Sequence, residues 1–546
     1  MKKIISMLLC TGIVMAIAND FTVCQSGCSY KSIQKAIDDL NNSKGEYTIH
    51  IQAGKYNEAL NISKSVNLIG EDPTNTIIDG ENSRRDIYIN KKGANIVIKN
   101  LQFINGRSGS GGGCLYIGGV NSLKIDNAIF QNCNAGAGGA IYIDQNVKTT
   151  IENSKFFNNS ASNGGAIESS NANISIKNSE ISGNTAIDSG GALYEADGSA
   201  ILDNDILYNN TANTGGAIYI YGNFSGNRLW IVKNSAQSNG GAIYSSYSPT
   251  FNNITSSIIA YNKTIDGTGS AIYYKADNFH NKIIDSDIVY NQSKNNNASA
   301  IYIKGANEYI LENNIFANNE TDLAFEIGDQ NRSFAHPTIA YNRFTHAPLH
   351  GKFVDVHTIY ANEILDANTT FFTDPVHFDF SLSKNSPLID SADISYALSY
   401  DIAGSTRPQG SSPDIGACEY PSVCKMRATK KVVQVCANKD IIYTVKEVDI
   451  PIKSGWTLDS IPYYHSITIE DIFGDNLQNV RTLWLWNAND KKWYVYSSDP
   501  KIKSIIEQYK TLDLLDTKDS INVGEGFWVN AKSSFTLHIP LHIPQE

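Results

Sequence analysis

A short motif of two glycines, a small residue, an aliphatic residue and usually tyrosine recurs at regular intervals through the middle of the chain. The copies are GGCLYI at position 112, GGAIYI at 138, GGAIES at 164, GGALYE at 190, GGAIYI at 215 and GGAIYS at 240, followed by the degenerate copies GSAIYY at 269 and ASAIYI at 298. The first six start 26, 26, 26, 25 and 25 residues apart, and the last two follow at intervals of 29. A fixed period of this length is typical of a solenoid, in which each repeat forms one coil and buries its apolar side against the next.

A second signature precedes each of the last seven copies. It has an apolar residue, Asn or Asp two positions later, an apolar or aromatic residue five later and Asn eight later. Examples are Ile151, Asn153, Phe156, Asn159; Ile176, Asn178, Ile181, Asn184; Ile201, Asp203, Ile206, Asn209; and Ile283, Asp285, Ile288, Asn291. Asn tolerates the left-handed backbone of tight turns and can bond to its copies in neighbouring coils. With strands about 4.8 Å apart, the two signatures together predict one coil of a parallel β-helix per repeat.

The composition excludes several other classes. Charged residues make up 18% of the chain, with 41 Gly, 29 Tyr and 4 Met, which fits neither a disordered chain nor a helical bundle. The formal charge of -11 argues against nucleic acid as a partner, because phosphate binding is driven by clustered Lys and Arg. After residue 18 no apolar run reaches the roughly 20 residues of a transmembrane helix.

The first 18 residues have the order of a secretory signal peptide. Lys2 and Lys3 precede the apolar run 4–17, which ends in small residues, and cleavage is expected after Ala18. Export permits disulfides, and the close pairs Cys24/Cys28 and Cys424/Cys436 are the plausible bridges, although connectivity cannot be deduced from sequence.

The chain divides into a cap, a solenoid and two C-terminal parts. Ile33, Ala36, Ile37 and Leu40 share one helical face, suited to covering the first coil. Five of the six Trp lie after residue 450, where alternation such as Leu-Trp-Leu-Trp indicates antiparallel strands. The predicted division is 1–18 signal peptide, 19–45 N-terminal cap, 46–370 β-helix of some twelve or thirteen coils at about 4.8 Å per coil, 371–420 closing segment and 421–546 Trp-rich β module.

Three stretches resemble known families. YKSIQKAIDDL with the following IHIQAGKYNEALNISKSVNLIGEDPTNTIIDG is similar to the start of pectinesterase-like β-helix proteins, and the GGAI repeats resemble those of polymorphic outer membrane proteins, which are surface adhesins. SPLIDSAD, DIAGSTRP and PDIGACEY, within 374–420, look like a choice-of-anchor Q domain. The resemblance implies an all-β, right-handed parallel β-helix of the pectin-lyase-like superfamily. That fold hosts lyases, hydrolases, esterases and non-enzymes alike.

A column of tyrosines is the main candidate site. In GGAIYI the two Ile face the core, so that the Tyr between them faces outward by strand alternation. Glu168 alone interrupts this column. The tyrosine rings of this column can stack on one another, or they can form a rigid binding face for a sugar or partner surface. The candidate ligand-binding residues are Tyr116, Tyr142, Tyr194, Tyr219, Tyr244, Tyr273 and Tyr302.

Other polar residues have simpler explanations. The pairs Asp203/Asp205 and Asp285/Asp287 include positions where other coils have Asn, so the turn column accounts for them. The chain contains neither Gly-His-Gly nor Arg-x-Pro-x-x-Arg, which would indicate an enzyme of this superfamily. Arg407 is expected to pair with Asp414 or Glu419. His346 and His350 are spaced for zinc on a helix, but Pro348 lies between them, and no metal site is predicted.

These features favour an exported bacterial protein, secreted or at the cell surface, that acts as an adhesion or glycan-binding scaffold. The expected partner is a glycan or cell-surface molecule, with no nucleic acid, no transmembrane helix and no cofactor. One alternative is a polysaccharide lyase or glycoside hydrolase acting on an extracellular polysaccharide, with calcium as a possible cofactor for a lyase. The other is a structural spacer.

Overall fold

The computed structural model describes most of the solenoid and part of the region after it. The described residues are 20–40, 47–246, 251–275, 280–293, 299–304, 308–319, 321–326, 338–346, 359–366, 368–426, 443–452, 455–460, 467–468, 479–487, 492–497, 520–521, 526–532 and 535–544. The predicted signal peptide lies outside them. Compact units span residues 1–428 and 429–546, and each is treated by itself.

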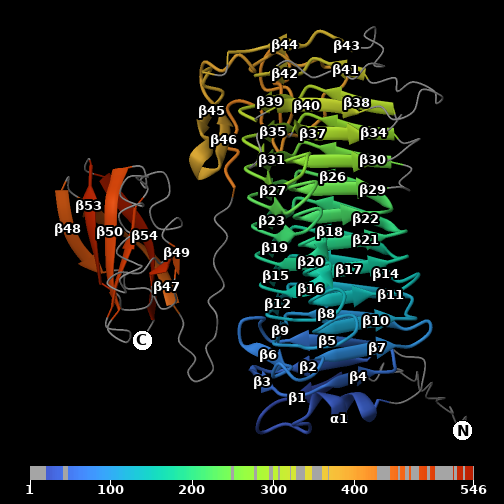
Figure 1. Ribbon diagram of the computed structural model, residues 1–546. Helices are drawn as coiled ribbons and strands as arrows, with labels where there is room; N and C mark the ends of the chain where they lie inside the picture. The colour runs from blue at the N-terminus through green and yellow to red at the C-terminus, as the bar shows by residue number, and fades with distance from the viewer. Residues whose placement is uncertain are drawn as a thin grey trace, which may run out of the picture. The chain divides into compact units, whose positions relative to one another are not determined.

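Long parallel sheets run the length of the first unit, as the repeat predicted. Within the described residues, sheet A has fourteen strands from β1 (Asp20–Val23) to β43 (Ile359–Tyr360), and sheet B has thirteen from β3 (Gly54–Tyr56) to β44 (Glu363–Ile364). Sheet C has eleven, from β4 (Leu60–Ile62) to β40 (Thr321–Glu326), and sheet D joins six middle coils from β16 (Ser160–Asn163) to β36 (Gln292–Ser293). Figure 1 shows these strands stacked coil upon coil. The chain is therefore an all-β parallel solenoid, which confirms the predicted fold class.

One coil illustrates the course of the chain. It passes through β14 (Lys148–Glu152) in sheet A, β15 (Lys155–Phe157) in sheet B, β16 in sheet D and β17 (Ile167–Ser170) in sheet C. Asn153 and Asn158, with φ of 52° and 56°, make the turns on either side of β15. The aliphatic residues of sheet C point into the core as expected, and Ile141, Ile218 and Ile301 are fully buried.

The glycine pair is required by close packing at the entrance to sheet C. Gly138 has a φ of +55°, a conformation that side chains disfavour. A Cβ on Gly139 would lie 2.1 Å from the carbonyl oxygen of Gly165 in the next coil. The second glycine therefore lets consecutive coils approach to sheet spacing.

A buried asparagine ladder follows sheet B. The side-chain Nδ2 and backbone N–H of Asn184 both donate to Oδ1 of Asn210, each at 3.0 Å. The predicted register is wrong by one residue in one coil, because Leu202 is buried where Ile201 was expected and Ile201 is 50% exposed. In that coil Asn210 occupies the ladder and Asn209 forms the left-handed turn. The pattern fits this coil equally well starting at Ile201 or at Leu202, because two aliphatic residues stand side by side there and Asn209 and Asn210 stand side by side eight positions later.

Three disulfides lie in the described residues. Cys24–Cys28 forms as predicted, but Cys424 pairs with Cys418 rather than with Cys436, which lies outside the described residues. The third, Cys114–Cys133, was not predicted. Cys133 occupies a ladder position, where its backbone N–H donates to Oδ1 of Asn159.

The Cys114–Cys133 bridge replaces ladder hydrogen bonds within one coil, and this can be tested. Cys133→Ala is expected to lower the free energy of unfolding by about 3 kcal/mol, the usual value for a loop of this length. The double variant Cys114→Ala/Cys133→Asn gives the coil the residues of its neighbours and is expected to recover most of that loss. Denaturant melts under oxidising conditions measure both. A double variant no more stable than the single one would show that this coil cannot accept the ladder amide.

The N-terminal end is closed by a short helix, as predicted. Helix α1 (Ile33–Asp38) begins at Ser32, whose hydroxyl accepts the N–H of Lys35, and it buries Ile33, Ala36 and Ile37. In Figure 1 it lies at the end of the solenoid opposite β43 and β44. It covers apolar positions that the first coil would otherwise expose.

Residues 371–420 were expected to close the C-terminal end. Together with 421–426 they form a segment, here called the flanking segment, that lies on the outer face of sheet B. The segment contains β45 (Phe372–Asp374), the 3₁₀ turn Pro375–His377 and β46 (Asp379–Leu382), which lie beside the coils in Figure 1. Its apolar residues form a second core with outward residues of sheet B. The sheet B members are Trp230, Val232, Ile258, Ala260, Val289, Ile315 and Ala317.

The second unit is antiparallel, as its alternation predicted. β47 (Tyr443–Ile452) pairs with β54 (Phe535–Pro544). A four-stranded sheet has the order β48 (Gly455–Ser460), β53 (Gly526–Ala531), β50 (Val480–Asn487) and β51 (Lys492–Tyr496). Across the whole of the described chain, no helix has the length and apolarity that crossing a membrane would need.

Candidate functional site

The tyrosine column lies on the outer face of sheet C in the predicted register. Direct strand pairing aligns Tyr116 with Tyr142 and Tyr194 with Tyr219, and the alignment continues through Tyr244 and Tyr273 to Tyr302. Tyr88 of β7 (Ile87–Asn90) adds one more ring at the N-terminal end, which the sequence pattern did not include. These rings are here called the tyrosine column.

Stacking within the column uses the ring faces. Neighbouring ring centroids lie 5.0 Å apart for Tyr194–Tyr219, 5.1 Å for Tyr219–Tyr244 and 5.5 Å for Tyr116–Tyr142, with nearly parallel planes. Tyr244 and Tyr273 are only 8% and 7% exposed. The partly exposed rings such as Tyr142 and Tyr219 leave edges open to a ligand, but Tyr244 and Tyr273, predicted to be accessible, are buried. The face-on contact expected from the sequence is not available to the stacked rings.

Glu168 of β17 occupies the gap in the column. It pairs with Tyr142 on one side and Tyr194 on the other, and it is 9% exposed. Burial raises the pKa of its carboxyl to about 7, against a lowering contribution from the Gly138 backbone N–H. Its Oε2 has no hydrogen-bond partner among the residues that the structure describes. The column thus contains one carboxyl that can hold or release a proton near neutral pH.

Arg85 lies against the N-terminal end of the column. Its guanidinium carbon is 5.5 Å from the ring centroid of Tyr88 and 5.3 Å from that of Tyr116. Its Nε donates to the carbonyl of Gly112 at 2.8 Å, and Nη2 donates to Ser108 Oγ at 2.7 Å. Burial of Tyr116 and the hydrogen bond that its hydroxyl donates to Asp144 together raise the pKa of Tyr116 to about 12.

The two aspartate pairs do not form one site. The turn column was predicted to contain Asp203, but Asn204 forms the left-handed turn there, and it is the buried Asp205 that accepts the backbone N–H of Ser179 at 2.7 Å. Asp203 binds Arg228 at 2.7 Å, which lowers the pKa of the aspartate despite partial burial. Asp285 and Asp287 are buried beneath the flanking segment, a contact that the sequence did not indicate.

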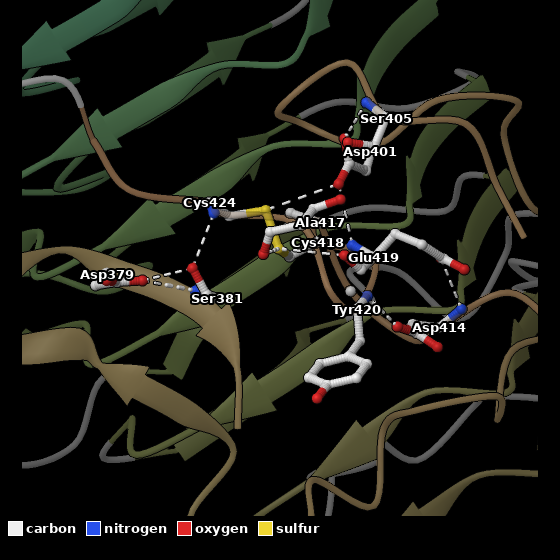
Figure 2. The surroundings of a disulfide bond; sticks show 12 residues. Asp379, Ser381, Asp401, Ser405, Asp414, Ala417, Cys418, Glu419, Tyr420 and Cys424 are labelled. Carbon is white, nitrogen blue, oxygen red and sulfur yellow. Dashed lines mark hydrogen bonds between the residues drawn. A yellow bond between two sulfur atoms is a disulfide. The ribbon is translucent and has the colours of Figure 1, made fainter. Parts of the chain in front are cut away.

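The flanking segment has its own buried polar network. Arg407 donates to Glu419 Oε2 at 3.3 Å, as predicted, and to the carbonyl oxygen of Asp414. Figure 2 shows Glu419 and Asp414 near the Cys418–Cys424 disulfide. Asp401 approaches both sulfurs of this bridge, and within the described residues this is the one grouping of three metal-type ligands. Because both sulfurs are bonded to each other, the grouping offers no thiolate to a metal.

The predicted histidine pair is only half described. His346 is exposed and hydrogen-bonds through its ring to Thr345 Oγ1 at 3.3 Å, while His350 lies outside the described residues. The structure therefore does not test the pair.

Two family models match the chain. Residues 113–288 match "Right handed beta helix region", and residues 20–134 match "Pectinesterase". A pectinesterase of Petunia integrifolia is 34% identical over 115 residues, which is 19% of this chain and 30% of that protein. The chain thus matches less than a third of the length of this relative.

Three solved structures show a partial likeness to the chain, each with a TM-score below 0.5. Pectate lyase Pel9A is 14% identical, with a TM-score of 0.35 over 73% of this chain and 96% of its own. The PL6 family polysaccharide lyase Pedsa3628 from Pseudopedobacter saltans is 10% identical, with a TM-score of 0.37 over 69% and 99%. The pectin methylesterase from Aspergillus niger is 16% identical, with a TM-score of 0.27 over 49% and 86%.

Proposed function

Starting from a pectin-lyase-like parallel β-helix, we propose that the protein binds an extracellular polysaccharide along the tyrosine column and acts on it, with Glu168 as its proton-transferring group. The observation that carries this proposal is the position of Glu168, a buried carboxyl between Tyr142 and Tyr194 in an otherwise aromatic column.

The chemistry of the column suits a sugar chain. Ring edges and hydroxyls can donate and accept hydrogen bonds with sugar hydroxyls, and a rigid stack loses little entropy on binding. General acid–base catalysis is most effective when the pKa of the group lies near the working pH. The pKa of Glu168, about 7, meets that condition.

The family matches support a polysaccharide-acting protein more than a passive adhesin. The pectinesterase match covers residues 20–134, which include Arg85, Tyr88 and Tyr116 of the column's N-terminal end. Because it covers a minor part of that family's length, the reaction and the sugar both belong to the proposal. The adhesin-like repeats and the choice-of-anchor Q resemblance of 374–420 stay predictions.

The experiment combines binding with product detection. The purified protein is incubated with pectin, alginate and other polysaccharides, with and without calcium, and unsaturated and reducing ends are measured. We expect products from at least one of them, and we expect Glu168→Gln to lower the rate at least 100-fold, the usual contribution of a general acid or base, with binding retained. If the carboxyl acts as an acid, the wild-type rate falls as pH rises through about 7, where the carboxyl loses its proton.

Glu195 supplies a matched control. Its carboxyl also has a pKa of about 7, raised by burial. Glu195 follows Tyr194 in β21 (Leu193–Ala196), so by strand alternation its side chain lies on the opposite face of sheet C from the tyrosine column, where it accepts the N–H of Gly198. Glu195→Gln should leave the rate unchanged. Equal losses in both variants would assign the effect to folding, and binding without any product would contradict the catalytic part of the proposal.

A binding scaffold without chemistry is the second candidate. A glycine pair precedes six strands of sheet C, from β10 (Leu115–Gly118) to β29 (Ile243–Ser246), and leaves two positions in each of those coils without a side chain. Retained binding without products would favour this scaffold, and loss of both would favour the structural spacer.

A further inference from the structure

Two buried aspartates of one coil bind the backbone of the flanking segment. Asp285 Oδ2 accepts the N–H of Leu398 at 2.7 Å, and Asp287 Oδ1 accepts the N–H of Ala417 at 2.9 Å. Both aspartates are at most 1% exposed. Within the described residues, the second oxygen of each carboxyl has no partner at hydrogen-bond geometry, although the side-chain amide of Asn313 lies near Asp285 and lowers the pKa of its carboxyl. Each aspartate therefore joins solenoid and segment through one oxygen and leaves the other oxygen buried.

No cation is bonded to these carboxyls in the described part of the chain. The positive charge of Arg407 in the segment lowers the pKa of both aspartates, but the hydrogen bonds of Arg407 go to Glu419 Oε2 and to the carbonyl oxygens of Asp414 and Gly416. Glu419 of the segment raises the pKa of Asp285, and Asp285 in turn raises the pKa of Glu312, which also faces Asp393 and Lys282. Asp414 of the segment faces Glu419 and Arg407. Figure 2 shows Ala417, Glu419 and Asp414 of the flanking segment.

We propose that Asp285 and Asp287 form a pH-dependent latch that docks the flanking segment most tightly when both carboxyls are protonated. A neutral carboxyl can still accept the segment N–H through its carbonyl oxygen and leaves no buried charge. Ionisation keeps the acceptor but places an uncompensated charge in the interface. This inference does not depend on the proposed function.

The direction of the pKa shifts agrees with this geometry. Burial raises the pKa of Asp285 to about 6 and that of Asp287 to about 7, from 3.8. In the undocked state both carboxyls would be hydrated, with ordinary pKa values. Because the docked pKa is the higher one, docking is strongest below about pH 4 and weakens by up to about tenfold per pH unit and per group, until pH passes the docked pKa.

Hydrogen exchange of the full chain tests the latch. Protection factors, corrected for the intrinsic pH dependence of exchange, are measured at pH 5 and pH 7.5 for Leu398, Ala417 and core strands of sheet A. We expect protection of Leu398 and Ala417 to be about 10-fold or more higher at pH 5, with a much smaller change in the core strands. Equal protection of the segment at both pH values would overturn the proposal.

The variants Asp285→Asn and Asp287→Asn separate charge from hydrogen bonding. Each keeps an oxygen that can accept the segment N–H but cannot ionise, so the double variant should keep the segment protected at both pH values. Asp205→Asn is the control, because Asp205 is also buried with a raised pKa but accepts N–H groups of the solenoid only. Persistence of the wild-type pH dependence in the double variant, or its loss in Asp205→Asn, would reject the latch.

Discussion

Protein truncated after residue 370 is expected to be insoluble or to aggregate. The flanking segment covers seven apolar residues on the outer face of sheet B, from Trp230 to Ala317, and the truncation would leave them as one continuous exposed patch. Covering a large apolar side chain contributes about 1.5–3 kcal/mol, so the loss would be a large share of a typical domain's stability. Soluble yield and the thermal melt of the fragment are the measurements.

Truncation after residue 428 is the control for this experiment. It removes the second unit and keeps the flanking segment whole, so a soluble and cooperatively melting protein is expected. If the fragment ending at 370 also melts cooperatively at the wild-type temperature, the segment does not contribute to the stability of the solenoid.

Gly165→Ala is expected to destabilise the solenoid by more than about 4 kcal/mol or to prevent folding. The added methyl group would lie 2.3 Å from the carbonyl oxygen of Gly191 and 2.7 Å from that of Thr185, both of them backbone atoms of the next coil. Because coil spacing is fixed by the sheet hydrogen bonds, neither atom can move without breaking them. Denaturant unfolding followed by far-UV circular dichroism measures the effect.

Gly109→Ala provides the contrast in the same region. A Cβ on Gly109 meets no atom within 4 Å, and its φ is not in the left-handed range. A change within about 0.5 kcal/mol is expected there. If Gly165→Ala were equally mild, the close approach of consecutive coils would not be what selects glycine at this motif position.

Much of the solenoid follows from patterns within one repeat. The inward aliphatic residues of sheet C and, outside the coil that contains Ile201, the ladder asparagines lie where the sequence pattern places them. Each depends on contacts with residues about one coil away, so every repeat supplies the same information again. The pattern failed where it was locally degenerate, as at Ile201 and Leu202, since a shift of one residue exchanges the two faces of a strand.

The candidate site was predicted in position but not in chemistry. Alternation was sufficient to place Tyr116 through Tyr302 in one outward column. It did not reveal that the rings would stack face to face, nor that Glu168 would be buried with a pKa of about 7. Burial depends on what neighbouring coils place beside a residue, which the strand that carries it does not encode.

The sequence by itself therefore determined the coil and its inward residues, because these arise from a short period repeated many times. It also determined the helical cap, because the apolar residues of that segment lie at helical spacing. Only the tertiary structure decided the partners of Cys114 and Cys424 and the position of the flanking segment. Ala417 and Asp287, for example, bond across 130 residues of chain. Such contacts depend on the shape and polarity of two finished surfaces, and no local periodicity specifies which surfaces will meet.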